Sequence, residues 1–228
     1  MAHFNSSLVP NKNLARSCYN GNMPKIVDPE ARRRAVADAV FRVARRDGLE
    51  NASLRNVAQE AGLAVGSVRH YFADHSDLML FAMRELARRV EARVRDHAEH
   101  LLATPPADNR AALVEDLLAE FLPLDQARHD EAVLWLAFCT AARVRPELRP
   151  SADRIHTGMR ELIERVLHEA QNAGGFPNHL DIPTEALRLL ALLDGLTLTS
   201  VLHPARLPAD DMRRVLRLHL RSLRGEKN

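Results

Sequence analysis

The stretch that decides the fold is SLRNVAQEAGLAVGSVRHYF, residues 53–72. Ser53 is of a residue type that caps helix N-termini, and Gly62 suits the left-handed conformation that redirects a chain between two helices. Val68 and Phe72 lie four residues apart, which places both on one face of a helix. The pattern therefore predicts two short helices joined by a tight turn, the arrangement of a helix-turn-helix unit.

Helical signals dominate the rest of the chain as well. Apolar residues recur at helical spacing, prolines and glycines separate the segments, and no segment shows the period of two expected of a strand. Aromatic residues make up only 4% of the chain, which disfavours an all-β fold. We expect an all-α fold of about nine helices. They are predicted at residues 29–47, 53–61, 67–72, 76–103, 109–122, 128–145, 151–173, 184–203 and 209–224.

The first residues differ in composition from the rest of the chain. Residues 1–22 hold five Asn, no acidic residue and no apolar period, so we predict a disordered N-terminal extension over residues 1–23. Met23 opens a segment that looks like a natural start, and we expect translation to begin there.

Composition and charge exclude several classes of protein. The 32 Lys and Arg against 30 Asp and Glu leave a net charge of +2, too balanced for a polybasic nucleic-acid coat. Two cysteines, Cys18 and Cys139, are too few for a disulfide framework or a zinc site. No apolar stretch reaches the ~20 residues of a membrane span, and no signal peptide is recognisable. We find no phosphate loop or nucleophile elbow, so we expect a cytoplasmic protein that is not an enzyme and needs no cofactor, metal or membrane.

The residues that form the helix-turn-helix also carry a resemblance to the TetR family of one-component bacterial regulators. The matching positions are Ser53, Val57, Ala58, Ala61-Gly62-Leu63, Gly66-Ser67-Val68, His70-Tyr71-Phe72 and Leu78. The later sequence is similar to the BetI-type branch of that family through residues 135–149 and Asp194-Gly195-Leu196. The resemblance implies a DNA-binding domain at residues 24–75 and a ligand-binding and dimerisation domain at residues 76–228.

The resemblance also implies which residues face DNA. Phosphates would be held by Ser53, Tyr71 and His75, and the base edges would be met by Ala64, Val65, Ser67, Arg69 and His70. The chain departs from the family at Arg69, where Tyr is frequent, and at His75, where Lys is usual. The Arg69 guanidinium can bind guanine bidentately, and contact with phosphate or solvent alone is the alternative.

For two further groups expected near the DNA, two roles are possible. Positive charge is concentrated at the start of the first helix by Arg32, Arg33 and Arg34. These arginines either neutralise phosphates or form a solvated cluster. Tyr71 either donates its hydroxyl to a phosphate or packs with its hydroxyl in water.

In the family, the helices after the DNA-binding part enclose a ligand pocket. The candidate pocket residues are Phe121, Trp135, Phe138, Cys139, His156, Met159 and Phe176. Plain core packing is the alternative for each of them. Trp135 is the best candidate, because its indole can stack on a cation or on a flat ligand.

The last two predicted helices carry the residues of a possible dimer face. These residues are Leu187, Ala191, Asp194, Leu198, Met212, Val215, Leu216 and Leu220. An intramolecular core would use the same residues, so the dimer rests mainly on the resemblance. Asp194 is a carboxylate within an apolar helix, and it must pair within the chain, bond across the dimer or meet a ligand.

The resemblance implies a homodimeric transcriptional repressor that a small-molecule effector releases from a palindromic double-stranded DNA operator. The alternative is a DNA-associated structural or protein-interaction factor with the same fold. Activation in place of repression, the effector and the operator sequence are left open by the sequence.

Overall fold

The computed structural model describes residues 29–103 and 110–224. Within these residues the chain forms nine α-helices, two short 3-10 helices and no strand, which confirms the expected all-α fold. The elements are α1 (Pro29–Asp47), η1 (Leu49–Asn51), α2 (Leu54–Glu60), α3 (Val65–Tyr71), α4 (His75–Ala103), α5 (Arg110–Ala119), α6 (Gln126–Val144), η2 (Pro146–Leu148), α7 (Arg149–Asn172), α8 (Ile182–Leu202) and α9 (Ala209–Leu223). The extension over residues 1–23 and the expected start at Met23 lie outside the described residues.

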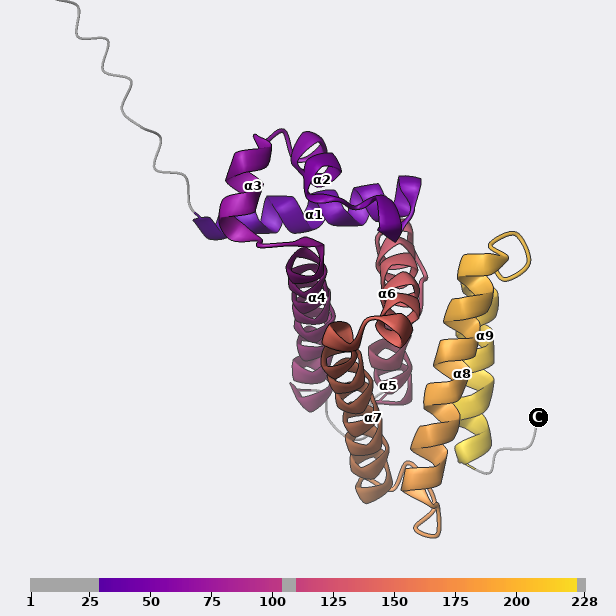
Figure 1. The fold of residues 1–228 in the computed structure, drawn as a ribbon. Coiled ribbons are helices and arrows are strands. Elements are labelled where there is room, and N and C mark those ends of the chain that lie inside the picture. The colour runs from indigo at the N-terminus through magenta and orange to yellow at the C-terminus, as the bar shows by residue number, and fades with distance from the viewer. Residues whose placement is uncertain (1–28, 104–109, 225–228) are drawn as a thin grey trace, which may run out of the picture.

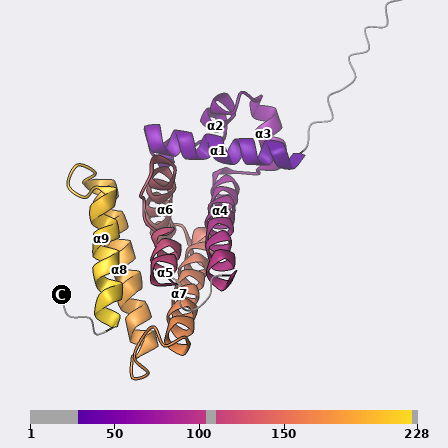
Figure 2. The same ribbon diagram turned by 180° about the vertical axis from the view of Figure 1, so that it is seen from behind.

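Helix α1 lies across one end of the molecule and separates two groups of helices (Figure 1). Helices α2 and α3 lie on its outer side, and the body from α4 to α9 lies on its other side. The ends of α4 and α6 meet α1, and α8 and α9 run side by side along one flank of the body, as the view from behind also shows (Figure 2). The helix-turn-helix is therefore carried on a face that the body leaves free.

Local chemistry explains the helix-turn-helix. Ser53 is the N-cap of α2, and its hydroxyl oxygen accepts a hydrogen bond from the backbone N–H of Asn56 at 3.2 Å. Gly62 has a φ of +66°, the left-handed conformation predicted for the turn. Val68 and Phe72 are both buried, as their spacing predicted. The capping residue, the turn glycine and the apolar pair thus act as the sequence indicated.

Helix α3 begins two residues earlier than predicted, at Val65. Ala64 takes the extended N-cap conformation, although its side chain accepts no capping hydrogen bond. Ser67, a residue type that is frequent at caps, lies instead within the first turn. The other predicted boundaries agree with the structure to within about one turn.

Two hydrophobic cores meet on α4. The first core joins α1, α2 and α3 to the first half of α4, the end of α6 and η2. The second lies among α5, α7, α8 and α9 and includes Val94 of α4. Val90, one turn earlier, packs against both cores. The packing therefore runs across residue 75, the expected end of the DNA-binding domain.

Ion pairs join the same parts of the molecule. Arg45 of α1 donates to Asp130 of α6 at 3.0 Å. Arg89 of α4 pairs with Asp38 of α1, and its guanidinium lies 4.6 Å from the centroid of the Phe41 ring. Helix α1 is thus held against the body through both α4 and α6.

Gly62 and Gly66 offer a matched test of the turn. An added Cβ meets no other atom within 4 Å at either position, so the two differ in backbone conformation and not in space. We expect Gly62→Ala to lower the free energy of unfolding by about 1 kcal/mol, because its side chain is forced into the left-handed region. Gly66→Ala lies within α3 and should raise that free energy by about 0.5 kcal/mol. Urea unfolding followed by circular dichroism measures both, and equal effects of the two variants would contradict this account of the turn.

Candidate DNA interface and effector cavity

Helix α3 carries Ser67, Arg69 and His70 on its solvent side, whereas Val65 also packs against the first core and Ala64 is the N-cap. Val68 is fully buried on the opposite face and anchors the helix. The residues predicted to meet base edges are exposed or partly exposed: Ala64, Val65, Ser67, Arg69 and His70. Arg69 makes no hydrogen bond or ion pair with another described residue. Its guanidinium is therefore available to a base edge or a phosphate.

One arginine of the α1 cluster lies against a predicted phosphate contact of α3. The guanidinium carbon of Arg33 lies 5.6 Å from the centroid of the partly exposed Tyr71 ring, and Arg33 also donates to Glu30 at 3.1 Å. Arg32 is partly exposed and Arg34 is exposed on the same turn of α1. The Ser53 oxygen already accepts the capping bond, so a phosphate would meet its hydroxyl hydrogen.

His75 lies at the start of α4 and faces the body. Its Nδ1 lies 3.0 Å from Nη1 of Arg145 at the end of α6, and its Nε2 is buried. Burial, followed by the positive charge of Arg145, lowers the pKa of His75 below its usual range, so the ring is neutral at pH 7 and accepts the bond from arginine. Beside it, the Ser76 hydroxyl donates to Glu147 at 2.9 Å. In this arrangement neither ring nitrogen of His75 is open to the phosphate contact that the resemblance implied.

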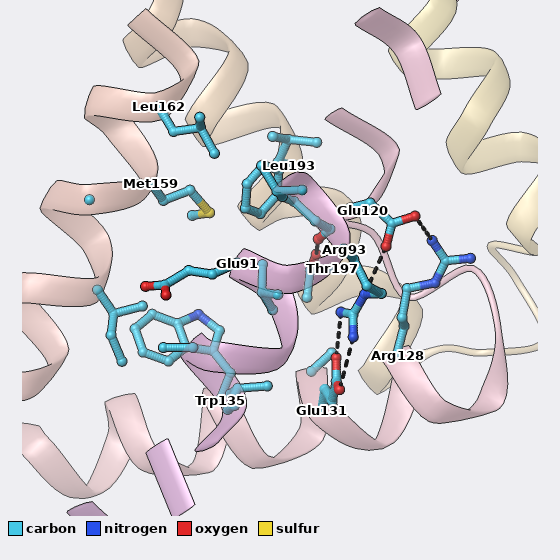
Figure 3. A pocket seen from close by; sticks show the side chains of 18 of the residues that line it. Glu91, Arg93, Glu120, Arg128, Glu131, Trp135, Met159, Leu162, Leu193 and Thr197 are labelled. Atoms are coloured by element: carbon cyan, nitrogen blue, oxygen red, sulfur yellow. Dashed lines mark hydrogen bonds and ion pairs between the residues drawn. The ribbon is translucent and has the colours of Figure 1, made fainter. Parts of the chain in front are cut away.

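The body contains a cavity of about 600 Å³ among α4, α6, α7, α8 and the segment after α5 (Figure 3). Apolar side chains supply much of its lining: Met83, Leu86, Val90, Phe121, Leu122, Trp135, Ile155, Met159, Leu162 and Leu193. The first half of α4, which packs against the DNA-binding helices, thus also forms one wall of the cavity.

Ion pairs line one side of the cavity, as Figure 3 shows. Arg93 of α4 donates to both carboxylate oxygens of Glu131 at 2.7 and 3.2 Å, and to Glu120 at 2.8 Å. Glu120 also accepts from Arg128 at 3.1 Å. Burial works against the charge of Arg93, but its bonds to Glu131 and Glu120 outweigh that effect and its pKa is raised. The two arginines of this wall are therefore already neutralised by carboxylates.

The predicted pocket residues divide into two groups. Those that line the cavity are Phe121, Trp135 and Met159. Those that lie outside its lining are Phe138, Cys139, His156 and Phe176. Phe138 is fully buried in the first core and stacks on Trp135 with ring centroids 6.5 Å apart. For Phe138 the packing alternative describes the structure, because its ring supports the indole from behind.

Asp194 of α8 also lines the cavity, near Cys139 of α6 and His156 of α7. Burial raises the pKa of Asp194, and the charge of His156 opposes that effect. Burial, followed by the negative charge of Asp194, raises the pKa of the Cys139 thiol to about 12. Asp194 makes no hydrogen bond or ion pair with any described residue. His156 is its charged neighbour within the chain, so pairing within the chain, contact with a ligand and contact across a dimer all stay open.

The predicted dimer residues also divide into two groups. Those buried in the second core of their own subunit are Met212, Leu216 and Leu220, and Val215 is partly buried against that core. Those on the exposed side of α8 are Leu187, Ala191, Asp194 and Leu198. Leu187 is 54% exposed, Leu198 45% and Leu202, further along the same helix, 61%. The apolar stripe of α9 thus serves the subunit itself, and the free apolar row is on α8.

Sequence reasoning missed the charged wall of the cavity. Arg93 continues the row of Met83, Leu86 and Val90 at spacings of three and four residues, so it occupies an apolar-face position of α4. A charged residue in such a row was the available signal. Its partner Glu131 shows no comparable signal, because only the fold brings α6 against α4.

The described residues hold neither a membrane-spanning helix nor a cluster of metal ligands. None of the helices within residues 29–103 and 110–224 is long and apolar enough to cross a bilayer. In the same part of the chain, no group of three or more His, Cys, Asp or Glu is arranged to hold a metal ion.

Comparison with known proteins finds that this chain is similar to transcriptional regulators. Residues 110–225 match the family described as BetI-type transcriptional repressor, C-terminal. The HTH-type transcriptional regulator PksA of Bacillus subtilis (strain 168) is 37% identical over 202 residues, which cover 88% of this chain and 94% of PksA. The protein belongs to the TetR family. It is a DNA-binding transcriptional regulator, as the helix-turn-helix indicated.

Solved structures of other regulators share this TetR-family fold. A transcriptional regulator from Rhodococcus sp. RHA1 matches with a TM-score of 0.70 and 29% identity, over 84% of this chain and 95% of that one. A transcriptional regulator from Saccharomonospora viridis, solved in complex with choline, matches with a TM-score of 0.69 and 25% identity, over 83% and 94%. The likeness covers the helix-turn-helix and the body together.

Arg69→Ala tests the assignment of α3 as the helix that reads bases. We expect the variant to lose about 1–3 kcal/mol of operator binding and to relax base preference at one position. The operator is obtained by selection from a random duplex pool, and binding is measured by gel shift. Arg206→Ala removes the same charge from the segment between α8 and α9 and should bind as the parent does. A uniform loss on all duplexes, with unchanged base preference, would assign Arg69 to phosphate.

Cys139 tests the electrostatic environment beside the cavity. Because its raised pKa lowers the thiolate fraction, we expect iodoacetamide at pH 8 to modify it at least about tenfold more slowly than an ordinary cysteine. Asp194→Asn removes a negative charge and should speed the reaction, whereas Glu169→Gln on the exposed side of α7 should not. Peptide mass spectrometry measures the rates. Equal rates in the parent and in Asp194→Asn would contradict the proximity of Asp194.

Proposed function

We propose that this TetR-family regulator is a homodimeric repressor that binds a palindromic double-stranded operator and is released by a small-molecule effector bound in the cavity. One observation carries the proposal: α4 forms a wall of the cavity and also packs in the core of the DNA-binding helices. A molecule in the cavity therefore contacts the helix on which the helix-turn-helix rests.

Two copies of α3 provide the operator contact. In a dimer with two-fold symmetry, each α3 enters the major groove of one half-site, and half-sites of this class lie about 34–36 Å apart. The arginines at the start of α1 neutralise phosphates and set the register, while α3 supplies base contacts. Repression results because the bound dimer occupies the operator.

The effector acts by favouring one position of α4 over another. A ligand shifts DNA binding only by its different affinity for the two shapes of the protein. On α6, Glu131 bonds Arg93 in the cavity wall, and the preceding Asp130 bonds Arg45 of α1. A ligand that displaces Arg93 therefore also disturbs the support of α1.

The exposed apolar row of α8 supports the dimer, because a row of this kind is typical of a surface that a second chain covers. Choline in the S. viridis relative supports a small-molecule effector in this fold. A bacterial transcriptional regulator must reach its operator in the cytoplasm. We therefore assign the protein to that compartment. We assign it no catalytic role and no cofactor.

A reporter gene behind the selected operator tests this proposal together with the dimer face. The parent protein should lower reporter expression. Leu198→Glu places a charge in the α8 row, so we expect it to sediment as a monomer and to lose repression. Val144→Glu makes the same change at a side chain that is 78% exposed at the end of α6, and it should still sediment as a dimer.

Three results would contradict the proposal. Raised reporter expression would make the parent an activator. Repression by a monomeric Leu198→Glu protein would remove the need for a dimer. A dimeric Leu198→Glu protein would place the interface on another surface.

A further inference from the structure

We propose that the cavity opens to solvent between α4 and α7, and that Ala87 and Gly158 form the entrance through which a ligand enters and leaves. The proposal rests on the proposed function of the cavity as the effector site, and it names the residues that control exchange with that site. Three observations support it: which lining residues are exposed, how α4 and α7 are aligned, and where their smallest side chains lie.

The exposed residues of the lining mark the open side of the cavity. All but one of them lie on α4 and α7: Arg84, Glu91 and Arg95 on α4, and Arg154, Gly158, Glu161 and Arg165 on α7. The exception is Asp194 of α8, in the row that the proposed dimer covers. The lining residues of α6 and of the segment after α5 are buried or partly buried. Solvent therefore reaches the cavity between α4 and α7.

The alignment of these two helices places Ala87 opposite Gly158. Helices α4 and α7 pack together and run in the same direction (Figures 1 and 2). At their first turns the Ser76 hydroxyl donates to Glu147 at 2.9 Å, which fixes their relative level. Ala87 lies eleven residues after Ser76, and Gly158 lies eleven residues after Glu147. Because helices rise by a constant length per residue, Ala87 and Gly158 lie at about the same level.

The rim of the cavity has its smallest side chains at this level. Ala87 carries one methyl group and Gly158 carries no side chain. An added Cβ at Gly158 meets no other atom within 4 Å, so the space in front of it is open. Longer charged side chains flank the two residues about one turn away on either side: Arg84, Glu91, Arg154 and Glu161. The widest part of the rim is therefore between residues 87 and 158.

The local structure does not require a glycine at position 158. The residue lies within α7, where glycine is less favourable than alanine. Its φ is not among the positive values of the chain, and no neighbouring atom would oppose a Cβ. A side chain at this position would therefore be accepted by the backbone, and its absence serves the opening.

An entrance of this kind controls the rate of binding more than its affinity. A larger side chain at residue 158 narrows the same passage for association and for dissociation. Because the free and the bound states are left as they were, both rate constants fall together and Kd changes little. Slow exchange with an unchanged Kd therefore distinguishes an entrance residue from a residue that holds the ligand.

Trp135 reports access to the cavity, because it is the single tryptophan of the chain and lies in the lining. Its ring stacks on Phe138 and packs against the first core, whereas Glu91 and Met159 lie beside it on the cavity side (Figure 3). A small quencher therefore reaches the indole through the cavity.

Acrylamide, an uncharged quencher, tests the entrance without any effector. We expect Gly158→Leu and Ala87→Leu in the full-length protein each to lower the quenching constant of Trp135 about threefold, because leucine narrows the passage. Thr157→Leu adds a side chain to the exposed side of α7, outside the lining, and should quench as the parent does. Thermal melts followed by circular dichroism show that each variant is folded.

Stopped-flow binding of N-phenyl-1-naphthylamine, an uncharged probe that fluoresces in apolar sites, measures exchange. We expect Gly158→Leu to lower the association and dissociation rate constants about fivefold each and to keep Kd within about twofold of the parent. Thr157→Leu should change none of the three constants.

Several results would overturn the proposal. They are a Trp135 that acrylamide reaches equally in the parent and in both leucine variants of the entrance, equal losses in Gly158→Leu and Thr157→Leu, and a weaker Kd with unchanged association. Neither measurement involves the operator. Entrance variants that behave as expected, in a protein that no cavity ligand releases from its operator, contradict the proposed function and leave the entrance standing.

Discussion

Helix α4 is packed into two hydrophobic cores at once, and this constraint sets the position of the DNA-binding helices relative to the cavity. Leu86 is buried with α1 and the end of α6, Val94 is buried with α5 and α7 to α9, and Val90 between them touches both groups. A rigid helix that is shared in this way cannot shift at one end without strain at the other, because packed interiors rearrange between discrete states. The α4 helix therefore links an occupied cavity to the orientation of α3.

The polar contacts join the same helices as the hydrophobic packing. Adjacent carboxylates on α6 face in two directions, Glu131 to Arg93 in the cavity wall and Asp130 to Arg45 on α1. His75 adds a third junction, since its neutral ring accepts a bond from Arg145 at the other end of α6. Charge pairs that are partly buried tolerate little change in geometry, so they favour a small number of defined arrangements over continuous bending.

Much of the fold could be predicted from local signals in the sequence. The cap at Ser53, the left-handed Gly62 and the buried pair of Val68 and Phe72 are features of a few neighbouring residues, and each appears in the structure as predicted. The start of α3 was predicted less well than its apolar face. The helix was expected from residue 67 but begins at Val65, because the backbone of Ala64 takes the extended N-cap conformation.

The candidate site was less predictable, because its residues come together only through tertiary packing. Trp135 and Met159 were expected in the cavity, but Phe138, three residues beyond Trp135, turns into the first core. The apolar stripe of α9 could not be assigned from periodicity, since a subunit core and a dimer face need the same pattern. His75 was assigned by resemblance, and its bond to Arg145 depends on a contact across 70 residues of sequence.

The most direct test of the account is fluorescence anisotropy of the full chain with its selected operator and with a scrambled duplex, at two salt concentrations. The account predicts a preference for the operator that survives the higher salt, because base contacts by α3 add to salt-sensitive phosphate contacts. Equal binding to both duplexes, lost in parallel as salt rises, would contradict it, since the α3 face would then read no sequence.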